Sequence, residues 1–188
     1  MRLFIERGFA ATTITLVAAA ASVSPETIYA TCDGKRGLLE GVVDTAIAGG
    51  VEAPLELQPV WGAIRQHRSA RERLRAYVAL TCRVLARTSA IHHVIRGAAD
   101  SEVFAADLSA RLLRERLASN TTHLRDYIGD ELRVGLTWRE AAERYCAISS
   151  PEVHHLLTTG LGWSRRAHEA WLWGLAEQDL IGPRSDDA

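Results

Sequence analysis

The segment from residue 3 to residue 39, LFIERGFAATTITLVAAAASVSPETIYATCDGKRGLL, decides the fold because it contains the start and stop signals of three short helices. Apolar residues on both sides of Gly8 predict a short first helix that stops where glycine can take a positive φ. Thr12 or Thr13 can cap a second helix. Its buried face is predicted at Ile14, Val17, Ala18 and Ala21.

The third helix has the strongest signals. Ser24 is a good N-cap residue, Pro25 suits the first helical position, and Glu26 places an acid in the first turn. The predicted inward contacts are Val23 and Ile28. The outward face carries small and hydrogen-bonding groups, Glu26, Thr27, Ala30 and Thr31, and such a face can enter the major groove of DNA.

Three motifs in this segment resemble the N-terminal domain of the TetR family of transcriptional regulators. They are LF-x-E-x-GF-x-ATT at residues 3–13, A-x-VS-x-x-TIY at residues 21–29 and K-x-x-LL at residues 35–39. A weaker similarity to the final helices of that family lies at residues 149–172, SSPEVHHLLTTGLGWSRRAHEAWL. The resemblance implies an all-α fold, with a helix-turn-helix DNA-binding domain at residues 1–45 and a larger helical ligand-binding and dimerisation domain at residues 46–188.

The resemblance also implies which residues contact operator DNA. Thr13, Tyr29 and Lys35 match phosphate-contacting positions, whereas residues 24–27 fall where the recognition helix meets bases or adjacent phosphates. The expected DNA-binding set is Thr12, Thr13, Ser24, Pro25, Glu26, Thr27, Tyr29, Thr31 and Lys35. Lys35 is the only lysine in the chain, and its alternative role is that of a solvated side chain near the start of the next helix, behind Asp33 as cap.

Several features weaken the DNA affinity expected from the resemblance. Members of the family usually begin several residues earlier, so the first helix looks truncated. Ser22 stands where the family usually has glycine, which predicts backbone strain of about 1 kcal/mol. Cys32 stands where the family usually has an aromatic residue. Residues 1–50 carry four basic and five acidic side chains, so the attraction to DNA of any sequence should be modest.

Composition favours a soluble, cytoplasmic protein. The 188 residues are 47% hydrophobic, which is enough for one small and one medium domain. No apolar run is long enough to span a membrane, and no signal peptide precedes Arg2. The three cysteines lack paired spacing, so neither a disulfide framework nor a cysteine metal site is indicated. A basic set, Arg65, Arg68, Arg71, Arg73 and Arg75, predicts a solvated helix face.

The pattern after residue 45 is helical nearly throughout, with breaks at Gly49, Gly50, Pro54 and Pro59. Ser69 and Glu72 form a capping-box pattern, and the helix that follows has a predicted buried face at Leu74, Tyr77, Val78, Thr81 and Leu85. Apolar residues between Phe104 and Ile128 predict one long or broken helix.

The last third of the chain is expected to form a homodimer. Thr137 and Glu140 make a second capping box, and Ser164 is a good cap for the final helix. The expected interface consists of Ala141, Tyr145, Ile148, Ala167, Ala170, Trp171, Gly174 and Leu175. Two such helices from each subunit suit a two-fold, four-helix interface. The alternative is that both apolar stripes pack in the core of their own subunit.

The family resemblance further implies a cavity for a small hydrophobic ligand. Its expected lining is Trp61, Tyr77, Cys82, Leu85, His92, Val94, Phe104, Leu108, Trp138 and Tyr145, although each could instead be ordinary core. The neighbours His92 and His93, like His154 and His155, point to different sides of a helix, so no metal site is predicted. No glycine-rich phosphate loop, nucleophile elbow or HExxH motif indicates an enzyme.

Together these features predict a dimeric transcriptional regulator that binds DNA, needs no cofactor and responds to a ligand. The expected mechanism is that of a repressor released from its operator by a small hydrophobic molecule. The alternative is a helical protein that binds a small molecule or a partner and whose DNA-reading segment has degenerated.

Overall fold

The computed structural model describes residues 1–50 and 55–181, apart from the side chain of Glu56. In this part of the chain every regular element is helical, and one isolated antiparallel bridge joins Leu132 to Ile181. The expected all-α fold is therefore confirmed. The break expected at Pro54 lies outside the described residues. No helix in the described ranges is long and apolar enough to cross a membrane.

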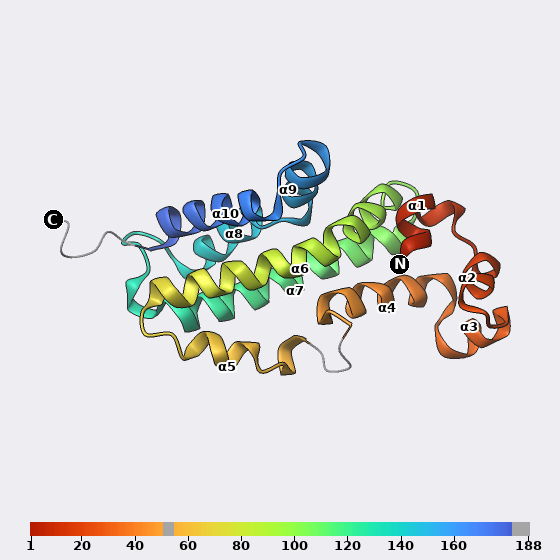
Figure 1. Ribbon diagram of the computed structural model, residues 1–188, viewed down its shortest axis with the longest axis horizontal. Coiled ribbons are helices and arrows are strands. Elements are labelled where there is room, and N and C mark those ends of the chain that lie inside the picture. Colours follow the sequence, from red (N-terminus) through yellow and green to blue (C-terminus); the bar gives the residue numbers. More distant parts are fainter. Residues whose placement is uncertain (51–54, 182–188) are drawn as a thin grey trace. The chain divides into compact units, whose positions relative to one another are not determined.

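The helices are shown in Figure 1. In chain order they are α1 (Arg2–Ala11), α2 (Ile14–Ala21), α3 (Pro25–Thr31), α4 (Gly34–Ala48), η1 (Leu55–Leu57), α5 (Val60–Arg65), α6 (Ala70–Ala98), α7 (Val103–Ile128), η2 (Gly129–Glu131), α8 (Trp138–Ile148), α9 (Pro151–His155), η3 (Leu156–Gly160) and α10 (Arg165–Leu180).

The chain groups into two compact units. Unit 1 contains residues 1–55 and 87–112, and unit 2 contains residues 56–86 and 113–188. The sequence predicted one boundary at residue 45, whereas unit 1 also includes the adjoining ends of α6 and α7. These two ends belong to unit 1 because their apolar side chains pack into the same core as α1 and α4.

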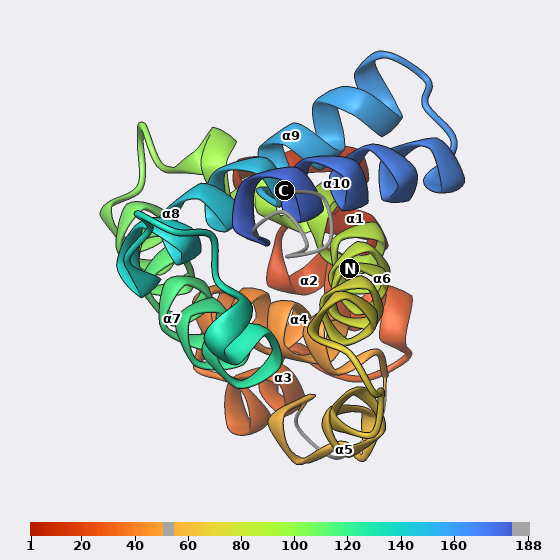
Figure 2. The ribbon, with the colours of Figure 1, turned by 90° about the vertical axis from the view of Figure 1, so that its left-hand side faces the viewer.

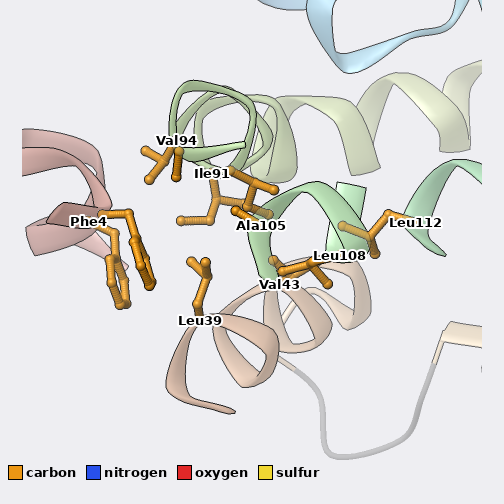
Figure 3. Close-up of a cluster of buried hydrophobic side chains, with 11 residues drawn as sticks. Phe4, Leu39, Val43, Ile91, Val94, Ala105, Leu108 and Leu112 are labelled. Atoms are coloured by element: carbon orange, nitrogen blue, oxygen red, sulfur yellow. The ribbon is translucent and has the colours of Figure 1, made fainter. Parts of the chain in front are cut away.

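The core of unit 1 is built around α4 (Figure 3). Leu39 and Val43 are fully buried there, together with Phe4 from α1, Ile91 from α6 and Leu108 from α7. Burying one such side chain contributes about 1.5–3 kcal/mol. The core therefore ties four helices of unit 1 together.

Two arginines add polar contacts to α4. Arg87 of α6 donates from Nε to the Ala46 carbonyl at 3.0 Å and from a terminal nitrogen to the Ile47 carbonyl, also at 3.0 Å. These carbonyls lie in the last turn of α4, where the Ala46 carbonyl also accepts from the Gly49 amide at 3.3 Å. Arg111 of α7 forms a 2.9 Å ion pair with Glu40.

Helix α1 breaks at Gly8, as the sequence predicted. Gly8 has φ 74° and ψ 175°, so two helical pieces meet there. The buried Thr12 holds the break, because its hydroxyl lies 2.7 Å from the Gly8 carbonyl oxygen and 3.1 Å from the Leu3 carbonyl oxygen. Thr12 is thus a structural residue at the C-terminal end of α1.

Helices α2 and α3 have the predicted caps. The Thr13 side chain accepts a hydrogen bond from the amide of Leu16, and the Ser24 side chain accepts one from the amide of Thr27. The two helices share a small core of Ile14, Ala18 and Ile28. The predicted inward contact of Val23 is wrong. Val23 is 42% exposed, because the chain turns at Ser22 and directs the next side chain outward.

Unit 2 combines α5, α8, α9 and α10 with the first part of α6 and the last part of α7 (Figure 2). Both predicted capping boxes are present, at Ser69 with Glu72 and at Thr137 with Glu140. Helix α7 is continuous, which settles the choice between one long helix and a broken one. Helix α10 packs beside α8, and its buried face consists of His168, Leu172, Ala176 and Leu180.

The turn between α2 and α3 offers a test of stored strain. Ser22 has φ 57° and ψ 39°, and it is the only residue other than glycine with a positive φ in the described ranges. We expect Ser22→Gly to raise the free energy of unfolding by about 1 kcal/mol, because glycine adopts this conformation without a Cβ penalty. Urea unfolding followed by circular dichroism measures the change. Ser22→Ala keeps the penalty and should give no gain.

Candidate DNA-binding surface and ring cluster

The exposed surface of α2 and α3 is rich in hydroxyl groups. Thr13, Ser24, Thr27, Tyr29 and Thr31 are all exposed. The hydroxyl of Thr31 donates to the Thr27 carbonyl at 2.8 Å, and those of Ser24 and Thr27 lie 3.2 Å apart. Thr13 differs, because its oxygen accepts from the Leu16 amide and its hydrogen remains available to donate. Thr15, which sequence reasoning missed, adds one more exposed hydroxyl to α2.

Tyr29 and Lys35 lie next to this surface. Tyr29 is 63% exposed, and its ring edge lies 3.5 Å from the point where Gly34 would carry a Cβ. Lys35 is half-buried. Its Nζ donates to the Ala10 carbonyl at 3.3 Å and lies 4.1 Å from the centre of the Phe9 ring. Lys35 therefore links the start of α4 to the end of α1, and its ammonium group has two further N–H donors.

Glu26 of α3 is the acidic residue on this surface, and its charged form is stabilised by hydrogen bonds. Hydrogen bonds from its own backbone amide and from the Ser24 side chain lower the pKa of Glu26. A charged carboxylate repels phosphate, but it can accept a hydrogen bond from the amino group of cytosine in the major groove. Pro25 is half-buried at the first position of α3. Glu26 thus suits base recognition better than phosphate contact.

The arginine-rich set at α5 and α6 forms contacts within unit 2. Arg65 pairs with Asp126 at 2.6 Å, and Arg71 pairs with Glu177. Arg73 donates from Nε to the Tyr127 carbonyl at 2.8 Å, and Arg75 lies 5.6 Å from the centre of the Trp173 ring. These contacts are consistent with the expected solvated helix face.

Unit 2 contains a group of five aromatic rings, which we call the ring cluster: Trp61, Tyr77, His123, Tyr127 and Tyr145. Trp61 of α5 stacks on His123 of α7, with centroids 4.0 Å apart and planes within 11°. Tyr77 of α6 lies 5.6 Å from His123 and 5.5 Å from both Tyr127 and Tyr145. The rings thus join four helices, α5, α6, α7 and α8.

Most polar atoms of the ring cluster have partners. Tyr77 donates to Oδ1 of Asn120 at 2.6 Å, and Tyr145 donates to the Thr81 hydroxyl at 2.9 Å. Burial raises the pKa of both hydroxyls. Tyr127 is the exception. Its hydroxyl is buried and has no hydrogen-bond partner among the described residues, and burial raises its pKa to about 12.

Residues 1–42, which contain the three short helices and the start of α4, match the family model described as bacterial regulatory proteins, TetR family. The resemblance inferred from the motifs is confirmed. The chain has the fold of the TetR family. No curated protein matches it in sequence.

Solved structures show the same fold over nearly the whole chain. A TetR-family transcriptional regulator from Rhodococcus sp. is 20% identical, with a TM-score of 0.68, and the match covers 93% of this chain and 90% of the other. The regulator FadR from Bacillus subtilis, solved with stearoyl-CoA, is 18% identical, with a TM-score of 0.71 and coverage of 93% and 92%. The ketosteroid transcriptional regulator KstR2 of Mycobacterium tuberculosis is 15% identical, with a TM-score of 0.55 and coverage of 96% and 90%.

The residues expected to line a TetR-type ligand cavity fall into both units. Phe104 and Leu108 pack in the core of unit 1, where Phe104 lies 6.3 Å from Phe9. Val94 is buried in the same core, and His92 lies half-buried on the same stretch of α6. The remaining six, Trp61, Tyr77, Cys82, Leu85, Trp138 and Tyr145, belong to unit 2, and three of them are in the ring cluster. Sequence reasoning missed Asn120, His123 and Tyr127.

The expected dimer residues fall into two groups, those buried within the subunit and those on its surface. Ala141 and Tyr145 of α8 are fully buried within the subunit, which is the alternative that the sequence left open. Ile148 is half-buried, and the exposed side of α8 is charged, with an ion pair between Arg139 and Glu143. On α10, Ala167, Ala170 and Gly174 are exposed, and Trp171 and Leu175 are half-buried. Only α10 presents the expected stripe on the surface.

A buried polar contact joins α6, α9 and α10. Nδ1 of His168 lies 3.6 Å from Sγ of Cys82, and the His168 and His154 rings meet edge to face with centroids 4.7 Å apart. Burial raises the pKa of the Cys82 thiol to about 12 and lowers the pKa of His168. The described residues contain no group of three or more side chains able to hold a metal ion. All three cysteines are free thiols.

This contact predicts a dependence of stability on pH. Burial and the neighbouring His168 lower the pKa of His154 from 6.5 to about 4, so between these values the unfolded chain binds more protons than the folded one. Stability is therefore fully present above pH 6.5 and falls as the pH drops towards 4. We expect the lowered pKa of His154 to reduce the free energy of unfolding at pH 5 by about 2 kcal/mol relative to its value above pH 6.5.

Urea unfolding at about pH 7.5 and pH 5 measures the loss. The His154→Gln variant should lose less stability than the wild type between these two pH values, because glutamine does not titrate. The exposed His93→Gln serves as the matched control and should keep the wild-type dependence. An equal dependence in all three proteins would contradict the assignment to His154.

Proposed function

We propose that this chain is a dimeric transcriptional repressor that binds operator DNA through α2 and α3 and is released by a small hydrophobic molecule. The observation that carries the proposal is the recognition helix. Helix α3 is capped by Ser24 and anchored by the buried Ile28, and its side chains other than Pro25 and Ile28 are exposed and mostly hydrogen-bonding. A helix anchored on one side and polar on the other suits a major groove.

The proposed contacts divide by chemistry. Thr13, Tyr29 and Lys35 donate to phosphates and fix the register of the protein on the duplex. Glu26 and Thr27 read base edges, and Ser24, Pro25 and Thr31 lie beside them. The buried Thr12 is not part of the proposed set, because its hydroxyl is used inside α1.

The proposed response to a ligand rests on the helical body. FadR was solved with stearoyl-CoA, and KstR2 is described as a ketosteroid transcriptional regulator. We infer a hydrophobic effector for this chain as well. A ligand can release DNA only if it binds the DNA-free state more tightly than the DNA-bound state, so this difference in affinity sets the size of the response.

The proposed dimer uses the exposed stripe of α10. Ala167, Ala170 and Gly174 are small, so the backbones of two α10 helices can approach closely across a two-fold axis. Trp171 and Leu175 beside them add apolar area. Two DNA-binding segments are needed to read two half-sites one helical turn apart.

DNA binding is tested by salt titration on two variants. Lys35→Met keeps an aliphatic stem over Phe9 but removes the charge. We expect it to weaken binding about tenfold or more near 0.1 M salt and to lower the slope of log Kd against log salt by about one for each lost contact. Tyr29→Phe removes a neutral hydroxyl, so it should weaken binding without changing the slope. Fluorescence anisotropy on duplex DNA from upstream of the coding sequence gives both quantities.

The exposed Arg114→Ala on α7 is the control and should leave the slope unchanged. A random duplex of the same length measures specificity. If the wild type shows no preference for the upstream DNA at any salt concentration, the regulator proposal fails and the alternative of a degenerate DNA-reading segment is favoured. A Lys35→Met variant with the wild-type slope would remove Lys35 from the phosphate-contacting set.

The dimer is tested by charge. We expect Ala170→Arg to convert dimers into monomers, because it places two like charges against each other across the two-fold axis at a cost of several kcal/mol. Native mass spectrometry reports the masses. Ala106→Arg changes another exposed alanine, on α7, and should leave dimers intact. Dimers that survive Ala170→Arg would place the interface elsewhere.

A further inference from the structure

The ring cluster of unit 2 contains one polar group without a partner. The other two tyrosine hydroxyls of the cluster donate to Asn120 and Thr81, whereas the Tyr127 hydroxyl donates to nothing in the described residues. A buried hydroxyl without a hydrogen bond costs about 1–3 kcal/mol. Native proteins rarely leave such a group unused, so it points to a role that the free protein does not fill.

Helix α5 packs against the ring cluster and against the residue next to Tyr127. Trp61 stacks on the His123 ring, and Arg65 pairs with Asp126, the neighbour of Tyr127. Of the six residues of α5, only Trp61 and Ile64 are buried. The Trp61 and His123 centroids are 4.0 Å apart, so nothing fits between the two rings. A molecule that stacks on this face of His123 must therefore replace Trp61.

The chemistry of the ring cluster around Tyr127 defines the class of molecule that could bind there. The Tyr127 hydroxyl stays protonated at neutral pH, because burial raises its pKa to about 12, so it can donate its hydrogen to an acceptor. A buried anionic acceptor would need a cation, and the nearest candidate, Arg65, is already paired with Asp126. A neutral acceptor such as a carbonyl oxygen meets no such cost. The faces of His123 and Tyr77 favour a flat aromatic body.

We propose that the effector of this chain is a neutral, flat aromatic carbonyl compound that stacks on His123 in place of Trp61 and accepts the Tyr127 hydroxyl hydrogen. This inference rests on the proposed ligand-responsive function and names its ligand class. Binding exchanges one ring stack for another and gives Tyr127 the hydrogen bond that it lacks. The gain in free energy therefore comes mainly from the newly satisfied hydroxyl, because the aromatic area that the ligand removes from water is offset by the indole surface that the displaced Trp61 exposes.

The probe pair is coumarin and octahydrocoumarin, two bicyclic lactones that share a carbonyl but differ in aromaticity. The full chain is labelled with 5-fluorotryptophan, and the five tryptophans are followed by fluorine NMR. The Trp61 signal is identified as the one missing in Trp61→Phe. We expect coumarin to shift the Trp61 signal and to bind at least about fivefold more tightly than octahydrocoumarin. A shift of Trp163 or Trp171 without Trp61, or equal binding of both lactones, would overturn the proposal.

Tyr127→Phe separates a ligand role from a structural one. The variant loses no hydrogen bond in the free protein, so its thermal midpoint should equal or exceed that of the wild type. Its affinity for coumarin should fall about fivefold to tenfold, as expected for one lost hydrogen bond. Tyr77→Phe is the matched control, because it loses the bond to Asn120 and should lower the thermal midpoint. Unchanged affinity in Tyr127→Phe would overturn the proposed role of Tyr127.

These measurements contain no DNA, so their outcome is independent of the operator test. A chain that prefers its upstream DNA but leaves the Trp61 signal unmoved by coumarin keeps the regulator proposal and loses this ligand class. A chain that binds coumarin as expected but shows no DNA preference keeps the aromatic site and loses the regulatory role. Release of the upstream DNA by coumarin, and not by octahydrocoumarin, would join the two.

Discussion

The burial of α4 is the constraint on which unit 1 depends. Leu39 and Val43 have no exposed surface, and they meet side chains from α1, α6 and α7 in one continuous core. Arg87 also satisfies the last carbonyls of α4. Helix α3 is joined to α4 by two residues only, so the fixed position of α4 limits the positions that α3 can take. The proposed recognition helix α3 is thus oriented chiefly by a core that lies outside it.

The core between α2 and α3 is too small to orient α3 alone. It consists of three buried residues, Ile14, Ala18 and Ile28, and Cys32 supplies less apolar bulk than an aromatic side chain would. The strained turn at Ser22 reduces the stability of this segment further. The link from Lys35 to the Phe9 ring and the Ala10 carbonyl therefore has a structural value in addition to any contact with phosphate. Packing within unit 1 therefore fixes the position of the Lys35 ammonium group.

Features set by neighbouring residues could be predicted from the sequence, and features set by distant residues could not. The caps at Thr13, Ser24 and Thr137 and the break at Gly8 were predicted because each depends on a few adjacent residues. Val23 was placed wrongly because the Ser22 turn redirects it. The ring cluster was missed in part, since His123 meets Trp61 only after α5 has packed against α7, and Tyr127 meets Tyr77 only after α6 has packed against α7.

The apolar stripe of α8 shows the same limit of prediction from sequence. Helical periodicity finds an apolar face, but it does not say whether that face meets its own subunit or a second copy. The structure decides this for α8, whose Tyr145 donates to Thr81 within the subunit, and it leaves the small residues of α10 on the surface.

Because the proposed DNA-binding segment has weak electrostatic attraction to DNA, its affinity should depend on the proposed dimer. With four basic and five acidic side chains in residues 1–50, one segment gains little from general attraction to phosphate. Joining two segments makes the second contact intramolecular, and the resulting effective concentration can raise the overall affinity by about 10²–10⁴ without any new contact. That gain is lost when the two segments no longer fit their half-sites together. For this chain, a ligand that changes only the spacing of the two segments would therefore suffice to release the DNA.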